Sequence, residues 1–123
     1  MGKTILVIDD EKSLLDVMGG WLTVCGYKVE TATSGAVALE KLNTISPSLI
    51  FLDIKMPGMD GFEVLFRLRR NPKTSSVPVI MLTGTAATAS ILKALEMRAV
   101  DYIIKPFEAD SLLKLIRRYE QSS

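Results

Sequence analysis

The sequence predicts an α/β fold of the doubly wound kind, in which five parallel strands form a sheet that helices cover on both faces. Four short runs are almost wholly apolar, as is typical of strands buried on both faces of a parallel sheet: Thr4–Ile8, Leu49–Leu52, Val77–Leu82 and Tyr102–Ile104. A fifth run, Lys28–Ala32, alternates charged residues with small or β-branched ones, which predicts an edge strand with one wetter side. Segments with helical periodicity lie between these runs.

The helices are predicted from apolar residues that recur at spacings of three and four. Between the first two strands these residues are Leu14, Val17, Met18, Trp21, Leu22 and Cys25, and near the C-terminus they are Leu112, Leu115, Ile116 and Tyr119. We expect Trp21 and Cys25 to belong to the core. Further helices are predicted at about residues 35–43, 61–70 and 87–97.

The length of the chain, 123 residues, predicts a single domain with a core over about residues 3–119 and a loose tail at 120–123. Its 15 Lys and Arg residues balance 14 Asp and Glu residues, so the charge gives no reason to expect nucleic-acid or membrane binding by this chain. No apolar stretch is long enough to span a membrane, and the one cysteine cannot form an internal disulfide. We therefore expect a cytoplasmic protein.

Polar residues follow the predicted strands at the points where these strands end. Asp9 and Asp10 follow the first strand, Asp53 the third, Thr83 the fourth and Lys105 the fifth. In open α/β sheets, ligands bind outside the carboxyl ends of the strands, near the point where the strand order reverses. We therefore expect three acids, one hydroxyl and one lysine to converge on a single crevice.

Each of these residues also has a simpler interpretation when it is taken alone. Asp10 could cap the N-terminus of the following helix, and Thr83 could be an ordinary threonine at the end of a strand. Lys105 could be a turn residue with its ammonium in solvent, and Asp53 could be a loop acid. Their joint placement at four strand ends is what favours a functional site.

The expected site has an excess of negative charge, because three carboxylates and one ammonium sum to about −2. Two like charges about 4 Å apart repel by roughly 4 kcal/mol at an effective dielectric constant of about 20. Protonation would relieve this repulsion, and so would a divalent cation. Magnesium suits one or two carboxylates together with waters and phosphate oxygens, whereas calcium prefers more oxygen ligands. We therefore favour Mg2+ as the cofactor.

A carboxylate beside a divalent cation, a lysine and a hydroxyl forms a site for phosphoryl transfer, in which the carboxylate acts as the nucleophile. The sequence has neither a GxxxxGK[ST] loop nor a GxGxxG motif, so nothing predicts a bound nucleotide. The chain also has no histidine. The phosphoryl donor should therefore be a reactive small molecule or another protein.

Four stretches of the sequence resemble the response-regulator receiver domains, and the resemblance covers the chain from Lys3 to about Arg118. They are ILVIDDE (5–11), LDIKMPGMDG (52–61), VIMLTG (79–84) and DYIIKPF (101–107). All four occur in the order and at the separations of that family, which makes the resemblance specific. It implies a flavodoxin-like sheet with the strand order 2-1-3-4-5.

The resemblance implies a role for each acid of the expected site. Asp53 matches the residue that accepts the phosphoryl group. Asp10, Asp53 and the backbone carbonyl of Lys55 match the direct ligands of Mg2+. Asp9 matches an acid that acts on the metal partly through water.

Further roles that the resemblance implies concern the phosphoryl group and the response to it. Thr83 and Lys105 match the residues that hold the phosphoryl oxygens, so that Asp53, Thr83 and Lys105 form the catalytic set. Tyr102 matches the aromatic residue that turns inward once Thr83 is drawn toward the phosphate. The bond between Lys105 and Pro106 matches a peptide that is usually cis in this family.

Three positions depart from the pattern of the family. Arg98 stands where the family usually has a glycine at the end of the fourth helix, and Val100 replaces a commonly acidic residue. Lys55, two residues after the acceptor, lies at a variable site thought to affect the lifetime of the phosphate. The first two departures leave the shape of the turn at residues 97–101 open.

The sequence thus predicts a signalling switch that takes a phosphoryl group from a histidine kinase or a histidine phosphotransfer protein. The response should change the surface of the fourth helix, the fifth strand and the fifth helix, and so control an output partner or domain. A magnesium-dependent phosphatase of the haloacid dehalogenase type would need an Asp where this chain has Lys55, so we expect no enzyme acting on outside substrates. An interaction module that never uses its phosphate site would not need the full set of acids, threonine and lysine.

The sequence leaves the organisation of the whole regulator open. The chain is either a stand-alone regulator or a receiver from a longer protein. A homodimer that forms on phosphorylation is compatible with both alternatives. The kinase, the output and the pathway are not encoded in any motif of these 123 residues.

Overall fold

The computed structural model describes residues 3–84 and 88–120, and within them five strands alternate with five helices. The strands are β1 (Thr4–Ile8), β2 (Lys28–Ala32), β3 (Leu49–Asp53), β4 (Val79–Thr83) and β5 (Asp101–Ile104). The helices are α1 (Lys12–Val24), α2 (Gly35–Lys41), α3 (Gly61–Arg70), α4 (Thr88–Glu96) and α5 (Ala109–Glu120). Among these described helices, none combines the length and the hydrophobicity needed to span a bilayer.

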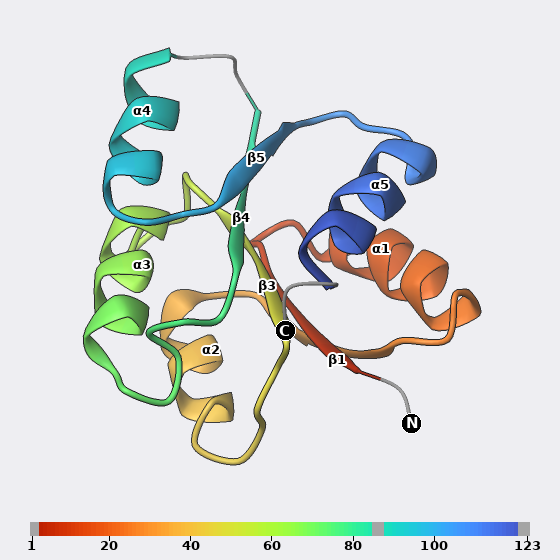
Figure 1. Ribbon diagram of the computed structural model, residues 1–123, viewed down its shortest axis with the longest axis horizontal. Coiled ribbons are helices and arrows are strands. Elements are labelled where there is room, and N and C mark those ends of the chain that lie inside the picture. The colour runs from red at the N-terminus through yellow and green to blue at the C-terminus, as the bar shows by residue number, and fades with distance from the viewer. Residues whose placement is uncertain (1–2, 85–87, 121–123) are drawn as a thin grey trace.

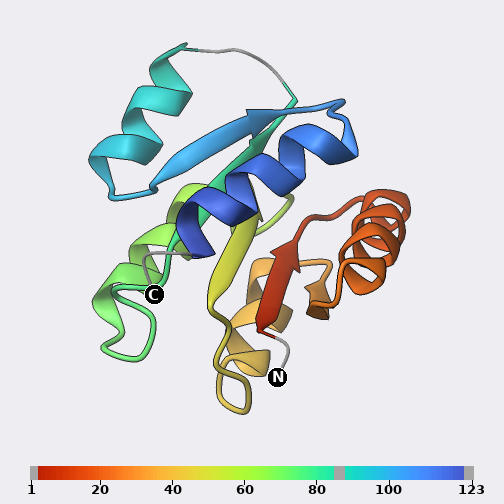
Figure 2. The same ribbon diagram turned by 45° about the vertical axis from the view of Figure 1, so that its right-hand side comes forward.

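All five strands run parallel in the order β2-β1-β3-β4-β5, which confirms the doubly wound sheet and its expected strand order. Helices α1 and α5 cover one face of the sheet, and α2, α3 and α4 cover the other (Figure 1). The turned view shows the same two layers (Figure 2). The strand order reverses between β1 and β3, since β2 lies on one side of this pair and β4 and β5 lie on the other. This is the place where such sheets bind ligands.

The sheet separates two hydrophobic cores because neighbouring residues of a strand point to opposite faces. Leu6 and Ile8 of β1 belong to the core beneath α2, α3 and α4, whereas Ile5 and Val7 belong to the core beneath α1 and α5. Every residue of β3 and β4 is buried. The ends of these central strands are therefore held on a closely packed support.

The sequence predicted only one of the two edge strands correctly. The prediction that Lys28–Ala32 forms an edge strand is confirmed. The prediction that Tyr102–Ile104 is buried on both faces is wrong, because β5 is the other edge strand and only Ile103 is buried. Tyr102 and Ile104 are each 38% exposed. A run of three apolar residues is too short to reveal whether its two faces differ.

Helix α1 buries part of the expected stripe, together with one residue outside it. Its buried residues are Leu15, Met18 and Leu22, which again recur at spacings of three and four. Trp21 is half-buried. The expectation that Cys25 belongs to the core is wrong, because Cys25 is exposed at the C-terminal cap of the helix, where the apolar stripe has already ended.

Some predicted helix boundaries differ from those of the structure. Helix α2 ends at Lys41 rather than at residue 43. Residue 87 of the predicted fourth helix lies outside the described residues, and Met97 lies just past the end of α4. Helix α1 begins after Glu11, which is its N-cap residue, so the alternative in which Asp10 caps this helix is wrong.

Arg98, in the turn between α4 and β5, has a φ of +74°. No other described non-glycine residue has a positive φ. This left-handed conformation is the one that glycine usually adopts at the end of a helix. The carbonyl of Arg98 accepts hydrogen bonds from Nε and Nη2 of Arg69, at 3.2 and 2.8 Å. The same guanidinium donates to the carbonyls of Thr74 and Val77. Arg69 thus ties this turn to the loop before β4.

Replacing Arg98 with glycine should stabilise the fold by roughly 0.5–1 kcal/mol, because glycine has no Cβ to strain at positive φ. The carbonyl of residue 98 remains available to Arg69 in the variant. Urea denaturation of the wild type and of Arg98→Gly measures the difference in the free energy of unfolding. Arg98→Ala, which keeps the Cβ, is the matched control. A glycine variant no more stable than the wild type would show that this turn is unstrained.

Candidate functional site

The structure places the expected acids and the lysine together at the carboxyl edge of the sheet. Asp9 and Asp10 follow β1 and Asp53 ends β3, and one carboxylate oxygen from each lies within 4.8 Å of the others. Lys105 follows β5, and its backbone N–H donates to the carbonyl of Thr83, the last residue of β4, at 2.7 Å. The ends of four strands therefore contribute to one site.

The ammonium of Lys105 lies among carboxylates. Its Nζ is 2.7 Å from Oδ2 of Asp9, 3.1 Å from Oε1 of Glu11 and 3.5 Å from Oδ1 of Asp53. Burial alone would lower the pKa of this ammonium. The hydrogen bonds to Asp9 and Glu11, together with the charges of Asp53 and Asp9, outweigh burial and raise the pKa above its ordinary value. Lys105 is therefore a cation in this site at every physiological pH.

Glu11 is a member of this cluster that the sequence analysis did not single out. Its carboxylate is exposed, and it joins Asp9 in holding Lys105. Its backbone N–H donates to Oδ1 of Asp9 at 2.9 Å. The sequence signal for Glu11 is the run of three acids directly after the first strand, of which only the first two were predicted to belong to the site.

Asp9 and Asp10 occupy different environments although they are neighbours in the chain. Asp9 is fully buried, and apart from the ammonium of Lys105 its Oδ2 has no hydrogen-bond partner among residues 3–84 and 88–120. Asp10 is exposed. Asp9 thus holds the lysine inside the site, and Asp10 is accessible to a ligand from solvent.

Asp53 is the most perturbed acid of the site. It is 4% exposed, and its Oδ1 accepts a hydrogen bond from the N–H of Lys55 at 3.3 Å. Burial first, then the charge of Asp9, and a hydrogen bond shared with Asp10 raise the pKa of Asp53 from 3.8 to about 7, against the opposing effects of Lys105 and the N–H of Lys55. Burial and the neighbouring negative charge together thus outweigh the effect of the one ammonium.

The three carboxylates have the spacing and the charge to hold a divalent cation. Oxygen ligands of one Mg2+ lie roughly 3–4 Å apart, since each Mg–O distance is about 2.1 Å. The three carboxylates already lie within 4.8 Å of one another, so small movements would bring them to a common ion. The excess of negative charge favours such an ion. The residues therefore fit Mg2+.

The loop after Asp53 is shaped by backbone contacts. The N–H of Gly61 donates to the carbonyl of Ile54 at 2.8 Å, and a Cβ at position 61 would collide with the backbone of Asp53 and Ile54. Asp60 caps α3, since its Oδ1 accepts from the N–H of Glu63 at 3.0 Å. On the opposite side of the crevice, the peptide between Lys105 and the following proline is cis. The contacts of Gly61 thus hold the loop after Asp53 close to the backbone of the acceptor.

Thr83 and Tyr102 point to the same face of the sheet, but only Thr83 lies at the strand end that borders the crevice. In the register of β4 and β5, Met81 pairs with Tyr102 and Thr83 pairs with Ile104. Paired residues of parallel strands and residues two apart point to the same face, and Met81 belongs to the core beneath α3 and α4. Thr83 is buried at the strand end. Tyr102 thus lies two pairs away from Thr83, on the side covered by α4.

A family model described as the response regulator receiver domain matches residues 5–117. Among curated relatives, the probable transcriptional regulator ycf27 of Pyropia yezoensis is 42% identical over 113 residues, which are 92% of this chain and 45% of that protein. The DNA-binding dual master transcriptional regulator RpaA of a Synechocystis strain is 35% identical over 113 residues, or 92% of this chain and 47% of that protein. The chain spans about half the length of these curated relatives.

Solved structures match this chain over nearly its whole length. The chemotaxis protein CheY4 of Vibrio cholerae has a TM-score of 0.93 and 30% identity, covering 97% of this chain and 99% of that one. The receiver domain of NtrX from Brucella abortus has a TM-score of 0.90 and 34% identity, with the same coverage of 97% and 99%. Fold and comparisons together define a regulatory module of two-component signalling. The chain belongs to the response-regulator receiver-domain family.

The raised pKa of Asp53 predicts a pH-dependent stability of the metal-free protein. In the unfolded chain this carboxyl titrates near 3.8, whereas in the fold its pKa is about 7. The protonated carboxyl therefore contributes stability that is fully present below pH 3.8 and is lost as the pH rises through 7. Asp53→Asn keeps a neutral side chain. It should exceed the wild type in free energy of unfolding by roughly 1–3 kcal/mol at about pH 8, and by much less at about pH 4.

Urea denaturation at several pH values, in the presence of a chelator, measures this difference. Asp16→Asn, at an exposed position on α1, is the matched control and should give no pH-dependent gain. Adding Mg2+ should reduce the advantage of Asp53→Asn at the higher pH, because the cation stabilises only the wild-type carboxylate. A constant difference between pH 4 and pH 8 would contradict the raised pKa.

Proposed function

We propose that this chain is a phospho-accepting signalling switch in which Asp53 takes a phosphoryl group from a histidine kinase or a histidine phosphotransfer protein. The observation that supports it most directly is the position of Asp53, buried at the end of β3 with Nζ of Lys105 3.5 Å from its Oδ1. A carboxylate oxygen attacks phosphorus, and the P–N bond of the donor phosphohistidine breaks. The ring nitrogen keeps the bonding electrons and takes a proton, while Asp53 becomes an acyl phosphate.

Asp10, Asp53 and the backbone carbonyl of Lys55 are the proposed direct ligands of Mg2+, with Asp9 acting through water. When bound, the cation stabilises the negative charge that develops on the phosphoryl oxygens. Burial and, after it, the charge of Asp9 raise the pKa of Asp53 to about 7, and a bound cation would offset both effects, which supports this part of the proposal. The N–H of Lys55 donates to Asp53, which keeps the peptide of residue 55 beside the acceptor.

Lys105 and Thr83 are proposed to hold the phosphoryl oxygens once Asp53 has accepted the group. Lys105 already contacts Asp53 and is held in place by Asp9 and Glu11. Its backbone N–H bonds the carbonyl of Thr83, so the two residues move as neighbours. A phosphoryl group on Asp53 brings oxygens that an ammonium and a hydroxyl can bind with charge-assisted hydrogen bonds.

The proposed response is a change in the surface of α4, β5 and α5. Only Ala94 of the described part of α4 is buried, so this helix is held to the sheet by few apolar contacts. The exposed apolar residues of α4 and β5, with the turn between them, are Leu92, Leu95, Val100, Tyr102 and Ile104. If phosphate draws Thr83 toward the crevice, Tyr102 can turn into the space beneath α4. The exposed set would then change its shape for a partner.

The output that this surface controls is proposed from the relatives. Two of them are named as transcriptional regulators, one as DNA-binding, and each is about twice as long as this chain. We infer that the receiver controls an output domain or a separate partner that acts on transcription, without touching nucleic acid itself. Phosphorylation-dependent homodimerisation through the exposed apolar face of α4 and β5 is one form of this control.

Acetyl phosphate with Mg2+ should add one phosphoryl group to the protein, and Asp53→Ala should abolish the addition, because the carboxylate is the nucleophile. Intact-mass spectrometry measures the added mass. A chelator should prevent the reaction, and Asp10→Ala should slow it. Asp60→Ala removes an acid from the same loop outside the crevice and is the control that should still be labelled. Labelling of Asp53→Ala equal to that of the wild type would refute the assignment of the acceptor.

Thr83→Ala should still accept the phosphoryl group on Asp53 but should transmit it less well to α4 and β5. The reason is that the hydroxyl is the proposed contact that differs between the two states. Amide chemical shifts of the phosphorylated variant should therefore change less than those of the phosphorylated wild type in α4 and in residues 101–113. Thr88→Ala, at the start of α4, is the control. Equal shifts in the phosphorylated wild type and Thr83→Ala would exclude Thr83 as the coupling residue.

A further inference from the structure

Glu11 has two separate roles, one for its backbone and one for its side chain. As the N-cap residue of α1, it supplies the carbonyl that accepts hydrogen bonds from the N–H groups of Leu14 and Leu15, at 3.1 and 3.2 Å. Its side chain makes no capping hydrogen bond. The carboxylate lies instead 3.1 Å from Nζ of Lys105. A substitution that alters only this side chain therefore leaves the start of α1 in place.

The ammonium of Lys105 has as many N–H donors as it has carboxylate neighbours, namely three. Asp9 is the nearest at 2.7 Å, Glu11 follows at 3.1 Å and Asp53 is the most distant at 3.5 Å. The ammonium thus lies closer to the acids that follow β1 than to the proposed acceptor. A phosphoryl oxygen on Asp53 would need one of these donors, so another carboxylate has to give up its contact.

Asp9 and Glu11 differ in how easily each can release the ammonium. Asp9 is fully buried, and among the described residues its Oδ2 has no hydrogen-bond partner besides Lys105. A buried carboxylate that loses its cation is strongly destabilised. The side chain of Glu11 is 59% exposed, so water can replace the ammonium there at little cost. Glu11 is therefore the partner that releases Lys105 more easily.

The surroundings of the Glu11–Lys105 pair leave room for this release. Both residues line a hollow of about 300 Å³, which Trp21 and Phe107 also border. A water molecule takes up about 30 Å³ in the liquid, so the hollow has space for several waters beside the carboxylate. The side chain of Glu11 can thus turn away from the ammonium without displacing packed atoms of the core.

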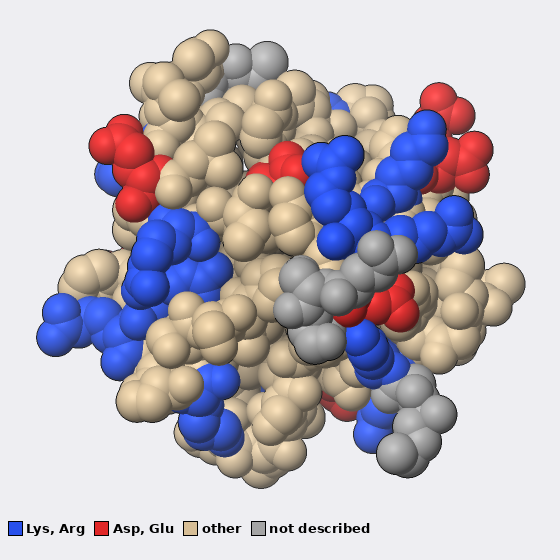
Figure 3. All heavy atoms as spheres, in the orientation of Figure 1, with Lys and Arg blue, Asp and Glu red and all other residues tan. Residues whose placement is uncertain are grey.

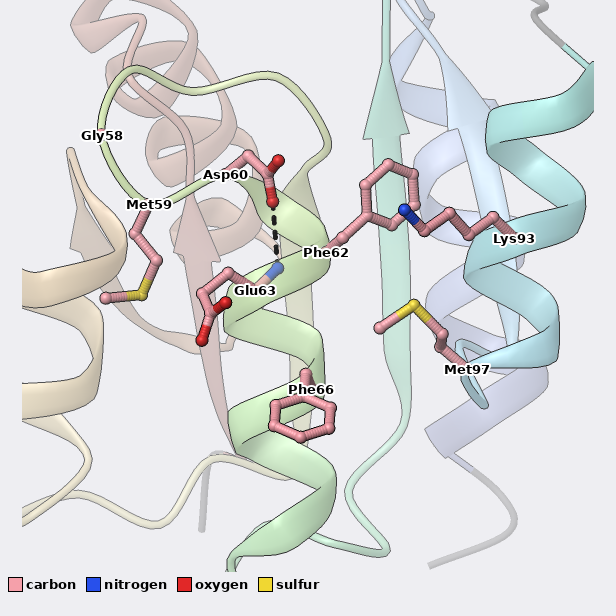
Figure 4. Close-up of a pocket in the computed structure, with 8 residues that line it drawn as sticks. All are labelled: Gly58, Met59, Asp60, Phe62, Glu63, Phe66, Lys93 and Met97. Atoms are coloured by element: carbon pink, nitrogen blue, oxygen red, sulfur yellow. Dashed lines mark hydrogen bonds between the residues drawn. The ribbon is translucent and has the colours of Figure 1, made fainter.

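The acids of the loop before α3 and of its first turn are engaged elsewhere. Figure 4 shows the carboxylate of Asp60 turned toward the N–H of Glu63, from which it accepts a hydrogen bond at 3.0 Å. Glu63 in turn pairs with Arg67 at 2.9 Å. Within residues 3–84 and 88–120, Glu11 is the one exposed acid that pairs with Lys105. The exchange therefore depends on this single side chain.

We propose that Glu11 is a positioning residue that holds Lys105 while Asp53 is unphosphorylated and releases it to the phosphoryl group. This proposal rests on the proposed function of Asp53 and adds a regulation of the same site. Glu11 and a phosphoryl oxygen compete for one N–H of the ammonium, whereas Asp9 keeps its contact in both states. The side chain at position 11 thereby limits how strongly the site holds a phosphoryl group.

The test uses beryllium fluoride with Mg2+, because BeF3− on a carboxylate is a tetrahedral mimic of a phosphoryl group. Titration followed by 19F NMR measures its dissociation constant. Glu11→Gln should bind the probe roughly two- to fivefold more tightly than the wild type, because the ammonium no longer leaves a carboxylate. Glu11→Asp keeps the charge, but its side chain is one methylene shorter and is drawn to cap α1. It should therefore also bind the probe more tightly.

Two comparisons separate the contact from the mere loss of a charge. Acidic and basic side chains are interspersed on the face shown in Figure 3, and the net charge of the chain is +1, so removing one exposed acid changes the overall field little. Glu108→Gln removes the same charge from an exposed position three residues after Lys105 and should bind the probe as the wild type does. Equal tightening in Glu108→Gln, or wild-type binding in Glu11→Asp beside tighter binding in Glu11→Gln, would overturn the proposal in favour of a simple charge effect.

The contact itself is measured in the unphosphorylated protein, so this result does not depend on phosphoryl transfer. The 13C signal of Cε of Lys105, assigned through Lys105→Arg, should move in both Glu11 variants and stay in place in Glu108→Gln. An unchanged signal in both Glu11 variants would show that Glu11 does not hold the lysine, and would overturn the proposal. A wild type that moves this signal on substitution of Glu11 but never binds the probe would instead contradict the proposed role of Asp53, and with it the exchange.

Discussion

Lys105 joins the end of β5 to the ends of β1 and β3, because its ammonium lies 2.7 Å from Asp9 and 3.5 Å from Asp53. This one cation balances the buried carboxylates of Asp9 and Asp53 and the exposed carboxylate of Glu11, and it does so incompletely. Burial is the largest cause that raises the pKa of Asp53 to about 7, and the charge of Asp9 adds to it against the opposing charge of Lys105. A site left short of positive charge in this way attracts a metal cation. The same shortage lowers the stability of the metal-free protein at neutral pH, a cost often found at functional sites.

The packing of the sheet differs between its centre and its β5 edge. This difference explains why the loss of stability at the site is tolerated and where a structural response can occur. Strands β3 and β4 are buried throughout, so Asp53 and Thr83 lie at the ends of strands whose packing resists movement. By contrast, α4 buries only Ala94 and β5 buries only Ile103. Elements with few buried apolar contacts have the lowest cost of local rearrangement. A change at Asp53, in the rigid centre of the sheet, can therefore alter the conformation of α4 and β5 at its loosely packed edge.

The sequence allowed the strands, their order and the acids of the crevice to be predicted because these features follow from local patterns and a specific resemblance. Alternation identified β2 as an edge strand, but the short run of β5 gave no sign that only Ile103 is buried. The helical spacing that included Cys25 correctly identified Met18 and Leu22 as buried, but it continued past the end of α1, where Cys25 is the exposed cap residue. Glu11 was missed because its link to Lys105 joins residues 94 positions apart.

The energy of the switch limits which contacts can operate it. Moving a two-state equilibrium from about 1:99 to 99:1 takes roughly 5.5 kcal/mol of differential binding. One hydroxyl contact contributes about 0.5–1.5 kcal/mol, so Thr83 alone is insufficient. Lys105 is the other candidate, because a phosphoryl group on Asp53 would compete with Asp9 and Glu11 for its ammonium. The backbone of Lys105 bonds that of Thr83, so a shift of the lysine reaches the end of β4 directly. If Asp53 accepts a phosphoryl group as proposed, charge rearrangement around Lys105 would therefore couple the phosphate to β4 and β5.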